Sequence, residues 1–154
     1  MLIVQMITGA MTTIGRRSQA NMQRWRKAVY RRDNDVCVAC AVMWGPHAMS
    51  SQLTLQHRVG RGMGGSARFD ETPAGLITFC AGHNLAETAE AKFARYCLEM
   101  GWSVPRWAFD NGWSLDIVPV RYFDGWFLLE GTDRVPMDDG LAAERMLEIY
   151  GPDF

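Results

Sequence analysis

The sequence has few of the features that mark secreted or membrane proteins. Only four of its 154 residues are cysteine, and two of these form the close pair Cys37 and Cys40, which favours a reducing compartment over a disulfide framework. The apolar opening, residues 1–11, has no basic n-region and is too short to cross a bilayer. We therefore expect a cytoplasmic protein with no membrane partner.

Net charge is also nearly absent, at −1, but the charges are unevenly distributed. Residues 1–68 carry ten Lys and Arg against two Asp, a balance of +8, whereas residues 69–154 carry six against fifteen acids, a balance of −9. Lys and Arg contacts to phosphate dominate affinity for nucleic acids, so we expect DNA to bind the basic half; an ordinary solvated surface is the alternative. The expected DNA contacts are Arg26, Lys27, Arg31, Arg32, Arg58, Arg61 and Arg68.

Two short motifs with the spacing of metal ligands lie 43 residues apart. The first is Cys37-Val-Ala-Cys40 and the second is Cys80-Ala-Gly-His83. A structural zinc ion takes about four sulfur and nitrogen ligands in a tetrahedron, and a separation of two residues lets one turn supply two of them. The four residues therefore predict a zinc site that joins the two ends of the segment between them.

The surrounding sequence resembles a known family over residues 20–95. The resemblance is to the zinc-containing HNH endonucleases that are common in bacteriophages, and it implies an α+β fold built on a ββα-metal unit. In that unit a strand ends in the catalytic histidine, a second strand follows a loop, and the next helix carries a metal ligand near its start. It also implies metal-dependent hydrolysis of DNA inside a bacterial host cell. The segments that carry it are WRKAVYRRD (25–33), Cys37 with Cys40, LQHR (55–58), GMGGS (62–66) and LITFC (76–80).

Transferred residue by residue, the resemblance gives three residues a catalytic role. His57 matches the general base, and Asn84 matches the helix-borne ligand of the catalytic divalent cation. Gln56 precedes the base, where the family usually has a metal-binding Asp or His. Amide oxygens are hard, uncharged ligands that favour Mg²⁺ or Mn²⁺ over zinc. Histidine, with an ordinary pKa of about 6.5, can take a proton from water near neutral pH.

The match to the family has three departures, and they leave alternatives open. Besides Gln56, Gly75 replaces the middle asparagine of the motif and His83 replaces a usual cysteine. The run 80–84 is closer to the resolvase-like branch, which also lacks the middle asparagine. A catalytically degenerate zinc module that binds DNA or a protein is the main alternative, and a packaging accessory protein is another. For Asn84 taken alone, the alternative is a helix N-cap.

Apolar periodicity predicts the elements around these motifs. We expect a helix over 18–32 that is broken at Asp33, strands over 53–57 and 76–79, and a loop over 58–73 between them. An apolar stripe from Leu85 to Met100 predicts one further helix. Cys97 lies on this stripe, so we expect a buried core thiol rather than another metal ligand.

From Trp102 onward the sequence predicts a different kind of structure. Alternation over 118–122 and 126–130, around Asp124-Gly125, predicts a β-hairpin, with Pro119 favouring a sheet edge. A last helix over 141–150 would be capped by Asp138 or Asp139. The expected organisation is an N-terminal tail (1–17), a zinc-stapled nuclease-like domain (18–100) and an acidic, aromatic hairpin–helix extension (101–154). This extension would pack on the domain or bind a phage or host protein.

Overall fold

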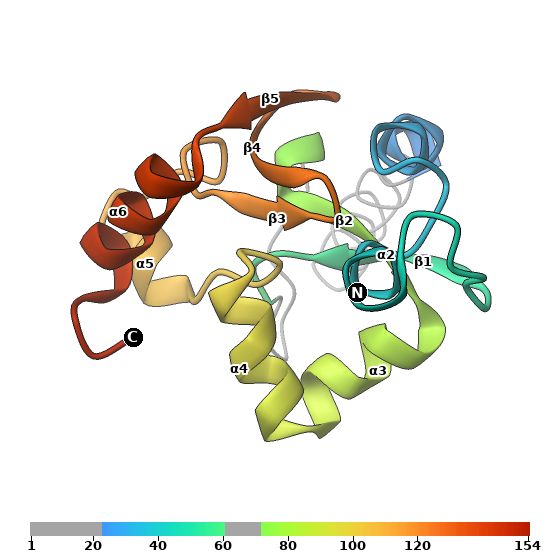
Figure 1. Ribbon diagram of the computed structural model, residues 1–154, viewed down its shortest axis with the longest axis horizontal. Helices are drawn as coiled ribbons and strands as arrows, with labels where there is room; N and C mark the ends of the chain where they lie inside the picture. The colour runs from blue at the N-terminus through green and yellow to red at the C-terminus, as the bar shows by residue number, and fades with distance from the viewer. Residues whose placement is uncertain (1–22, 61–71) are drawn as a thin grey trace, which may run out of the picture.

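The computed structural model describes residues 23–60 and 72–154, and these residues have a mixed α+β architecture. The expected tail (1–17) and the expected DNA contacts Arg61 and Arg68 lie outside the described residues. In chain order the elements are a helix over 23–32, α2 (Val38–Trp44), β1 (Leu53–His57), η2 (Pro73–Gly75), β2 (Leu76–Cys80), α3 (Ala81–Ala89), α4 (Ala91–Glu99), α5 (Arg106–Asp110), β3 (Val120–Tyr122), β4 (Gly125–Glu130), β5 (Asp133–Met137) and α6 (Asp139–Tyr150) (Figure 1).

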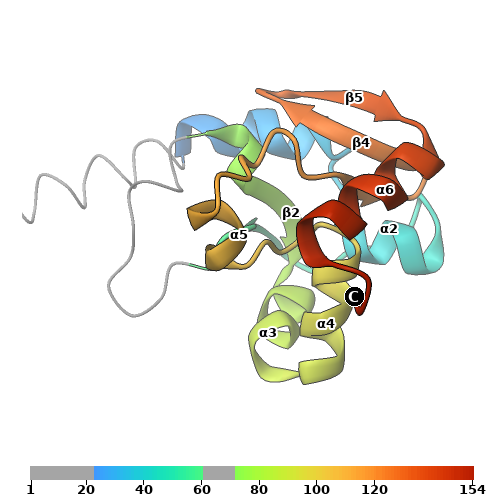
Figure 2. The same ribbon diagram turned by 90° about the vertical axis from the view of Figure 1, so that its left-hand side faces the viewer.

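Strands β1 and β2 form an antiparallel hairpin that lies between two helical layers. Leu53 pairs with Cys80 at one end of the hairpin, and His57 pairs with Leu76 at the other. The helix over 23–32 covers one side, where Val29 packs against Leu55 and Leu76, and α3 lies on the opposite side (Figures 1 and 2). The two predicted strands are confirmed, and α3 begins directly after β2.

Backbone conformation explains the outcome of two helix predictions, one of which is confirmed and one of which is wrong. The first helix ends as expected, because Asn34 and Asp35 both adopt left-handed φ values, of 61° and 55°. The single helix expected over 85–100 is wrong. Glu90 takes an extended conformation, with φ −120° and ψ 108°, and separates α3 from α4. Leu85 consequently lies on the surface, with 68% of its area exposed, while Cys97 is fully buried as expected.

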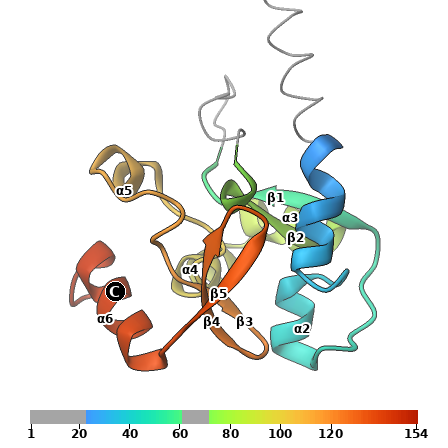
Figure 3. The same cartoon turned by 90° about the horizontal axis from the view of Figure 1, so that it is seen from above.

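The C-terminal segment forms a second sheet, with the strand order β3-β4-β5. Its first turn is the predicted one, because Tyr122 pairs with Gly125 across it. The first strand lies at an edge, as Pro119 predicted, and Asp138 caps α6 by accepting from two backbone N–H groups. Strand β5 was not predicted. Figure 3 shows this sheet between α2 on one side and α5 with α6 on the other.

One apolar core extends through both expected parts of the chain. It runs from Cys37 at the start of α2 to Ile149 in α6, and the largest of its fully buried side chains is Trp102. The backbone is tightly packed at Gly101, whose φ is +69°, because a Cβ atom there would lie 1.8 Å from the carbonyl oxygen of Pro119. Among the described residues, no helix has the length and apolar character needed to cross a bilayer.

Candidate metal centre and active site

The four residues of the predicted zinc site come together in the structure. Their ligand atoms, three Sγ and one imidazole nitrogen, all lie within 4.8 Å of one another. Nδ1 of His83 is 3.3 Å from Sγ of Cys37 and 3.4 Å from Sγ of both Cys40 and Cys80, and the last two sulfurs are 4.0 Å apart. In a tetrahedral zinc site the nitrogen–sulfur and sulfur–sulfur distances are about 3.5 Å and about 3.8 Å, given bonds of about 2.3 Å to sulfur and about 2.0 Å to nitrogen. The cluster can therefore hold a zinc ion.

Two helix starts position the ligands. Cys37 is the N-cap of α2 and Cys80 is the N-cap of α3. In each case the sulfur accepts a 3.5 Å hydrogen bond from the backbone N–H three residues later, that of Cys40 or His83. The same local conformation thus presents both members of each pair and directs N–H groups at sulfur, where they stabilise a thiolate.

Burial affects the protonation of the four residues of the cluster. Desolvation raises the pKa of the Cys37 thiol to about 12, because the thiolate loses its hydration. Burial alone would also raise the pKa of Cys80, but hydrogen bonds to its sulfur, led by the backbone N–H of His83, lower it. Desolvation lowers the pKa of His83, which keeps the imidazole neutral as metal ligation requires. A bound dication supplies the positive charge that three neighbouring thiolates need.

Aromatic side chains fix the ring of His83. Phe93 of α4 stacks on the imidazole, with ring centroids 5.0 Å apart and planes at 22°. Phe79 of β2 meets the ring edge-on at 6.3 Å. The extended Glu90 lets α4 turn back against α3, so the helix break that the sequence did not reveal contributes to the metal centre.

The side chain of Asn84 is hydrogen-bonded to the first strand of the hairpin, β1. It is the fourth residue of α3 and does not cap this helix, since Cys80 occupies the N-cap. Its Nδ2 donates a 2.8 Å hydrogen bond to Oγ1 of Thr54 in β1. This bond holds the first turn of α3 against the strand that ends in His57.

Gln56 and His57 project from opposite faces at the end of β1, because successive side chains of a strand alternate. Gln56 shares its face with Thr54, and its Nε2 donates a 3.2 Å hydrogen bond to the carbonyl of His57. Gln56 is 8% exposed, and His57 is partly buried on the face of Leu55. The structure thus brings Asn84 to the face of β1 that carries Gln56, and it places His57 on the other face.

Two of the expected DNA contacts are wrong, and Arg32 is the first. Its side chain is 1% exposed. The guanidinium group donates to both oxygens of the Asp33 carboxylate, at 2.7 and 3.0 Å, and to the carbonyls of Pro73 and Leu76. Asp33 in turn accepts from the backbone N–H of Thr78. Arg32 is therefore a buried link between the first helix and β2.

Arg58 is the second expected contact that the structure overturns. It is completely buried, although it directly follows His57 in the chain. Its guanidinium donates to four backbone carbonyls at 2.8 to 3.1 Å, so its hydrogen bonds are directed into the protein. No local pattern in the sequence distinguishes this arginine from a surface cation. The four acceptors belong to Ala74, Gly101, Leu115 and Val118.

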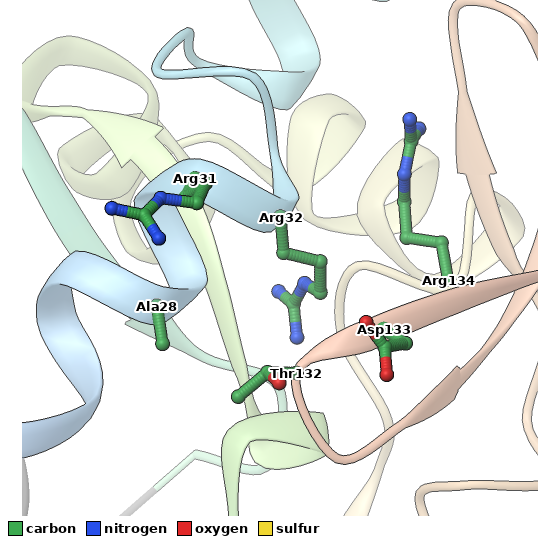
Figure 4. Close-up of a pocket in the computed structure, with 6 residues that line it drawn as sticks. All are labelled: Ala28, Arg31, Arg32, Thr132, Asp133 and Arg134. Atoms are coloured by element: carbon green, nitrogen blue, oxygen red, sulfur yellow. The ribbon is translucent and has the colours of Figure 1, made fainter.

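The helix over 23–32 keeps the exposed part of the expected basic surface. Arg26, Lys27 and Arg31 are all exposed on it. A surface groove of about 470 Å³ separates the end of this helix from the turn between β4 and β5 (Figure 4). On the far side Arg134 is held by Asp124, at 3.2 Å, and lies over two aromatic rings. Positive charge available to a ligand is thus concentrated on the helix side. The groove is lined by Ala28, Arg31, Arg32, Thr132, Asp133 and Arg134.

Two groups of the site were missed at the sequence level. Thr54 could have been identified from strand alternation, since it is a polar residue two positions before Gln56 and therefore lies on the same face of the strand. Asp33 could not have been identified in this way, because charged residues that follow a helix usually lie on the solvent-exposed surface. Comparisons with protein-family models, with curated proteins and with solved structures found no match. The evidence on function therefore comes from these residues and from the resemblance of their motifs.

Proposed function

We propose that the protein is a metal-dependent DNA endonuclease of the HNH type, encoded by a bacteriophage. The observation that carries the proposal is the hydrogen bond from Asn84 to Thr54. It connects the helix that follows the hairpin to the strand that ends in His57. The antiparallel β1–β2 hairpin, the helix directly after it and the Cys₃His cluster at its base support a ββα-metal unit stapled by zinc.

The chemistry would be hydrolysis of a phosphodiester bond at the end of β1. His57 takes a proton from water through a ring nitrogen, the water oxygen bonds to phosphorus, and the bond to the leaving 3′ oxygen breaks. Gln56 and Asn84 would hold Mg²⁺ or Mn²⁺ through amide oxygens, and the ion, when bound, polarises the phosphate and stabilises the leaving oxygen. Gln56 and His57 are consecutive at the end of β1 and project from opposite faces, so the phosphate would have to lie across the strand end to contact both.

The exposed cations on the helix over 23–32 support DNA as the substrate. That helix packs on the hairpin face of Leu55, which is also the face of His57. Arg26, Lys27 and Arg31 therefore lie on the layer next to the proposed base, where they would bind the DNA backbone. Phosphate oxygens would also add the negative charge that two neutral amide ligands lack.

A catalytically degenerate zinc module that binds DNA is the second candidate. The burial of Gln56 favours it, because this residue is only 8% exposed and its Nε2 donates a hydrogen bond to a backbone carbonyl. A position that usually supplies a charged ligand is thus filled by a neutral, constrained amide. In this candidate the zinc cluster and the basic helix keep their roles, and the hairpin has no reaction to catalyse.

A plasmid-nicking assay tests the proposal. Supercoiled DNA is incubated with purified protein and Mg²⁺, Mn²⁺ or EDTA, and His57→Ala is compared with His47→Ala, which changes an exposed histidine in the turn after α2. We expect His57→Ala to abolish nicking while zinc content and DNA affinity stay unchanged, because the base acts in the transition state. His47→Ala should nick like the parent. Equal nicking by parent and His57→Ala would reject the proposed active site.

A further inference from the structure

The hydroxyl group of Thr54 lies between two hydrogen-bond partners. Its Oγ1 donates to the carbonyl oxygen of Phe79, at 3.0 Å, across the β1–β2 pair. The same oxygen accepts from Nδ2 of Asn84, at 2.8 Å. A hydroxyl has one proton, and a carbonyl can only accept. The proton is therefore committed to Phe79, and Thr54 can offer Asn84 only a lone pair.

This arrangement determines the orientation of the Asn84 amide. The side of the amide that faces Thr54 is the donor, Nδ2, because Oδ1 in that place would compete with the carbonyl of Phe79 for the single hydroxyl proton. Oδ1 lies on the other arm of the planar group and is turned away from Thr54. Since α3 also fixes the backbone of Asn84, the strand and the helix together direct this carbonyl oxygen.

We propose that Thr54 is a positioning residue that presents Oδ1 of Asn84 to the catalytic divalent cation. This inference rests on the proposed function and adds a residue to it. A hard cation binds the oxygen of an amide and not its nitrogen, so a freely rotating Asn84 would offer the correct atom for only part of the time. The two hydrogen bonds, from Thr54 to Phe79 and from Asn84 to Thr54, disfavour the orientation in which the Asn84 amide would present its nitrogen to the cation. Thr54 lies on the same face of β1 as Gln56, the other expected ligand of this ion.

Substitution of Thr54 by Val and by Ser separates the hydroxyl from the shape of the side chain. Thr54→Val keeps the volume and the strand preference but removes the hydrogen bonds, whereas Thr54→Ser keeps the hydroxyl. The readout is the side-chain amide signal of Asn84 in NMR spectra of the zinc-loaded full chain, titrated with Mn²⁺, whose unpaired electrons broaden nearby signals. Zinc content and spectral dispersion verify folding, and Thr54→Ala serves as a second hydroxyl-free variant if Thr54→Val does not fold.

In the parent and in Thr54→Ser we expect two well-separated Asn84 amide protons that broaden at the same Mn²⁺ concentration. In Thr54→Val the hydrogen-bonded proton should lose its distinct shift, and half-maximal broadening should need about tenfold more Mn²⁺, as for other residues that orient metal ligands. Equal titrations of Thr54→Val and the parent would overturn the inference, as would a parent signal that Mn²⁺ does not broaden.

The nicking assay distinguishes this inference from the proposed function. Thr54-dependent broadening in a protein that never nicks DNA would support the positioning role and reject the endonuclease. Nicking by a protein whose Asn84 signal is unaffected by Mn²⁺ would support the endonuclease and reject the role of Thr54.

Discussion

The hydroxyl of Tyr122 in β3 donates a 2.7 Å hydrogen bond to Oδ1 of Asp33, 89 residues earlier in the chain. The same carboxylate binds the guanidinium of Arg32 and the backbone N–H of Thr78. Asp33 is 1% exposed, so this charge is held in the interior by directed donors. The end of the first helix, the β1–β2 hairpin and the C-terminal sheet are thereby joined at one side chain.

This contact predicts how stability responds to alkaline pH. Burial, with the neighbouring Asp33 adding to it, raises the pKa of Tyr122 well above its ordinary value of 10. The folded state therefore favours the neutral phenol. Its stabilisation is complete below pH 10 and is lost as the pH rises toward the folded-state pKa. We expect the free energy of unfolding to fall above pH 10, with a contribution from Tyr122 of up to about 1.4 kcal/mol per pH unit.

Tyr122→Phe checks this contribution. The variant should be less stable at pH 7 by about 2 kcal/mol, because Asp33 loses a donor, and its stability should fall less steeply above pH 10. Urea unfolding at several pH values measures both effects. Tyr150 and Cys97, whose pKa values burial raises to about 12, are retained in the variant and contribute to the remaining slope. An identical alkaline slope in parent and variant would contradict the prediction.

Gly101→Ala should destabilise the protein severely. The left-handed backbone alone costs an alanine about 1 to 2 kcal/mol, and the added Cβ would collide with the carbonyl oxygen of Pro119. Gly131→Ala is the matched control, because Gly131 has a similar φ, of +59°, and a Cβ there meets nothing within 4 Å. We expect a loss of more than about 4 kcal/mol at position 101, or no folded protein, and only the backbone cost at 131. Equal losses in urea unfolding would show that the close approach carries no energy.

Purified protein should contain about one zinc ion per chain, because binding to a closed Cys₃His set is also folding free energy. Cys40→Ser should lose zinc and fail to fold. Cys97→Ala removes a buried thiol outside the cluster and should keep the metal. Elemental analysis together with circular dichroism provides the check. A well-folded parent without zinc would remove the basis for the staple.

Affinity for duplex DNA should fall steeply with salt, because each phosphate contact releases counterions. Replacing both Arg26 and Arg31 by Gln should reduce the slope of log K against log salt by about 2. Lys92→Gln with Arg106→Gln makes the same change in net charge on α4 and α5, away from the first helix (Figure 1), and should leave the slope nearly unchanged. Salt titrations by fluorescence anisotropy measure both. Equal slopes for the two double variants would place the DNA elsewhere.

Gln56→Asp should increase nicking at low metal concentration, since a carboxylate restores the charge that a neutral amide lacks. In the parent, Mn²⁺ should support nicking better than Mg²⁺, because it binds such sites more tightly. Nicking rates across a metal titration test both expectations. If neither the parent nor Gln56→Asp cuts with either metal, the degenerate binding module becomes the better account.

The parts of the fold that follow from local rules were predictable from the sequence. The β1–β2 strands, the Asp124-Gly125 turn and the Asp138 cap depend on alternation, turn chemistry and capping within a few residues. The Cys₃His cluster was predictable because zinc coordination restricts both the ligand types and their spacing. Catalysis and DNA binding remain predictions that rest on these residues.

The remaining features depend on contacts between distant segments. A charged side chain near a basic helix resembles a surface residue, yet Arg32 and Arg58 are buried because carbonyls from later segments surround them. The break at Glu90 is likewise not encoded by a proline or glycine, and the apolar stripe continues through it. Strand β5 contains Pro136, which argues against a strand by local rules but is compatible with its place at a sheet edge.

The four backbone carbonyls around Arg58 also determine whether residues 23–100 can fold independently of the rest of the chain. Of its four acceptors, only Ala74 precedes residue 100; Gly101, Leu115 and Val118 come later. A fragment that ended at residue 100 would leave an interior cation with one of these four acceptors, and an uncompensated buried charge costs about 3 to 5 kcal/mol. The β1–β2 hairpin and the Cys₃His cluster therefore depend on the segment after residue 100 for a stable interior.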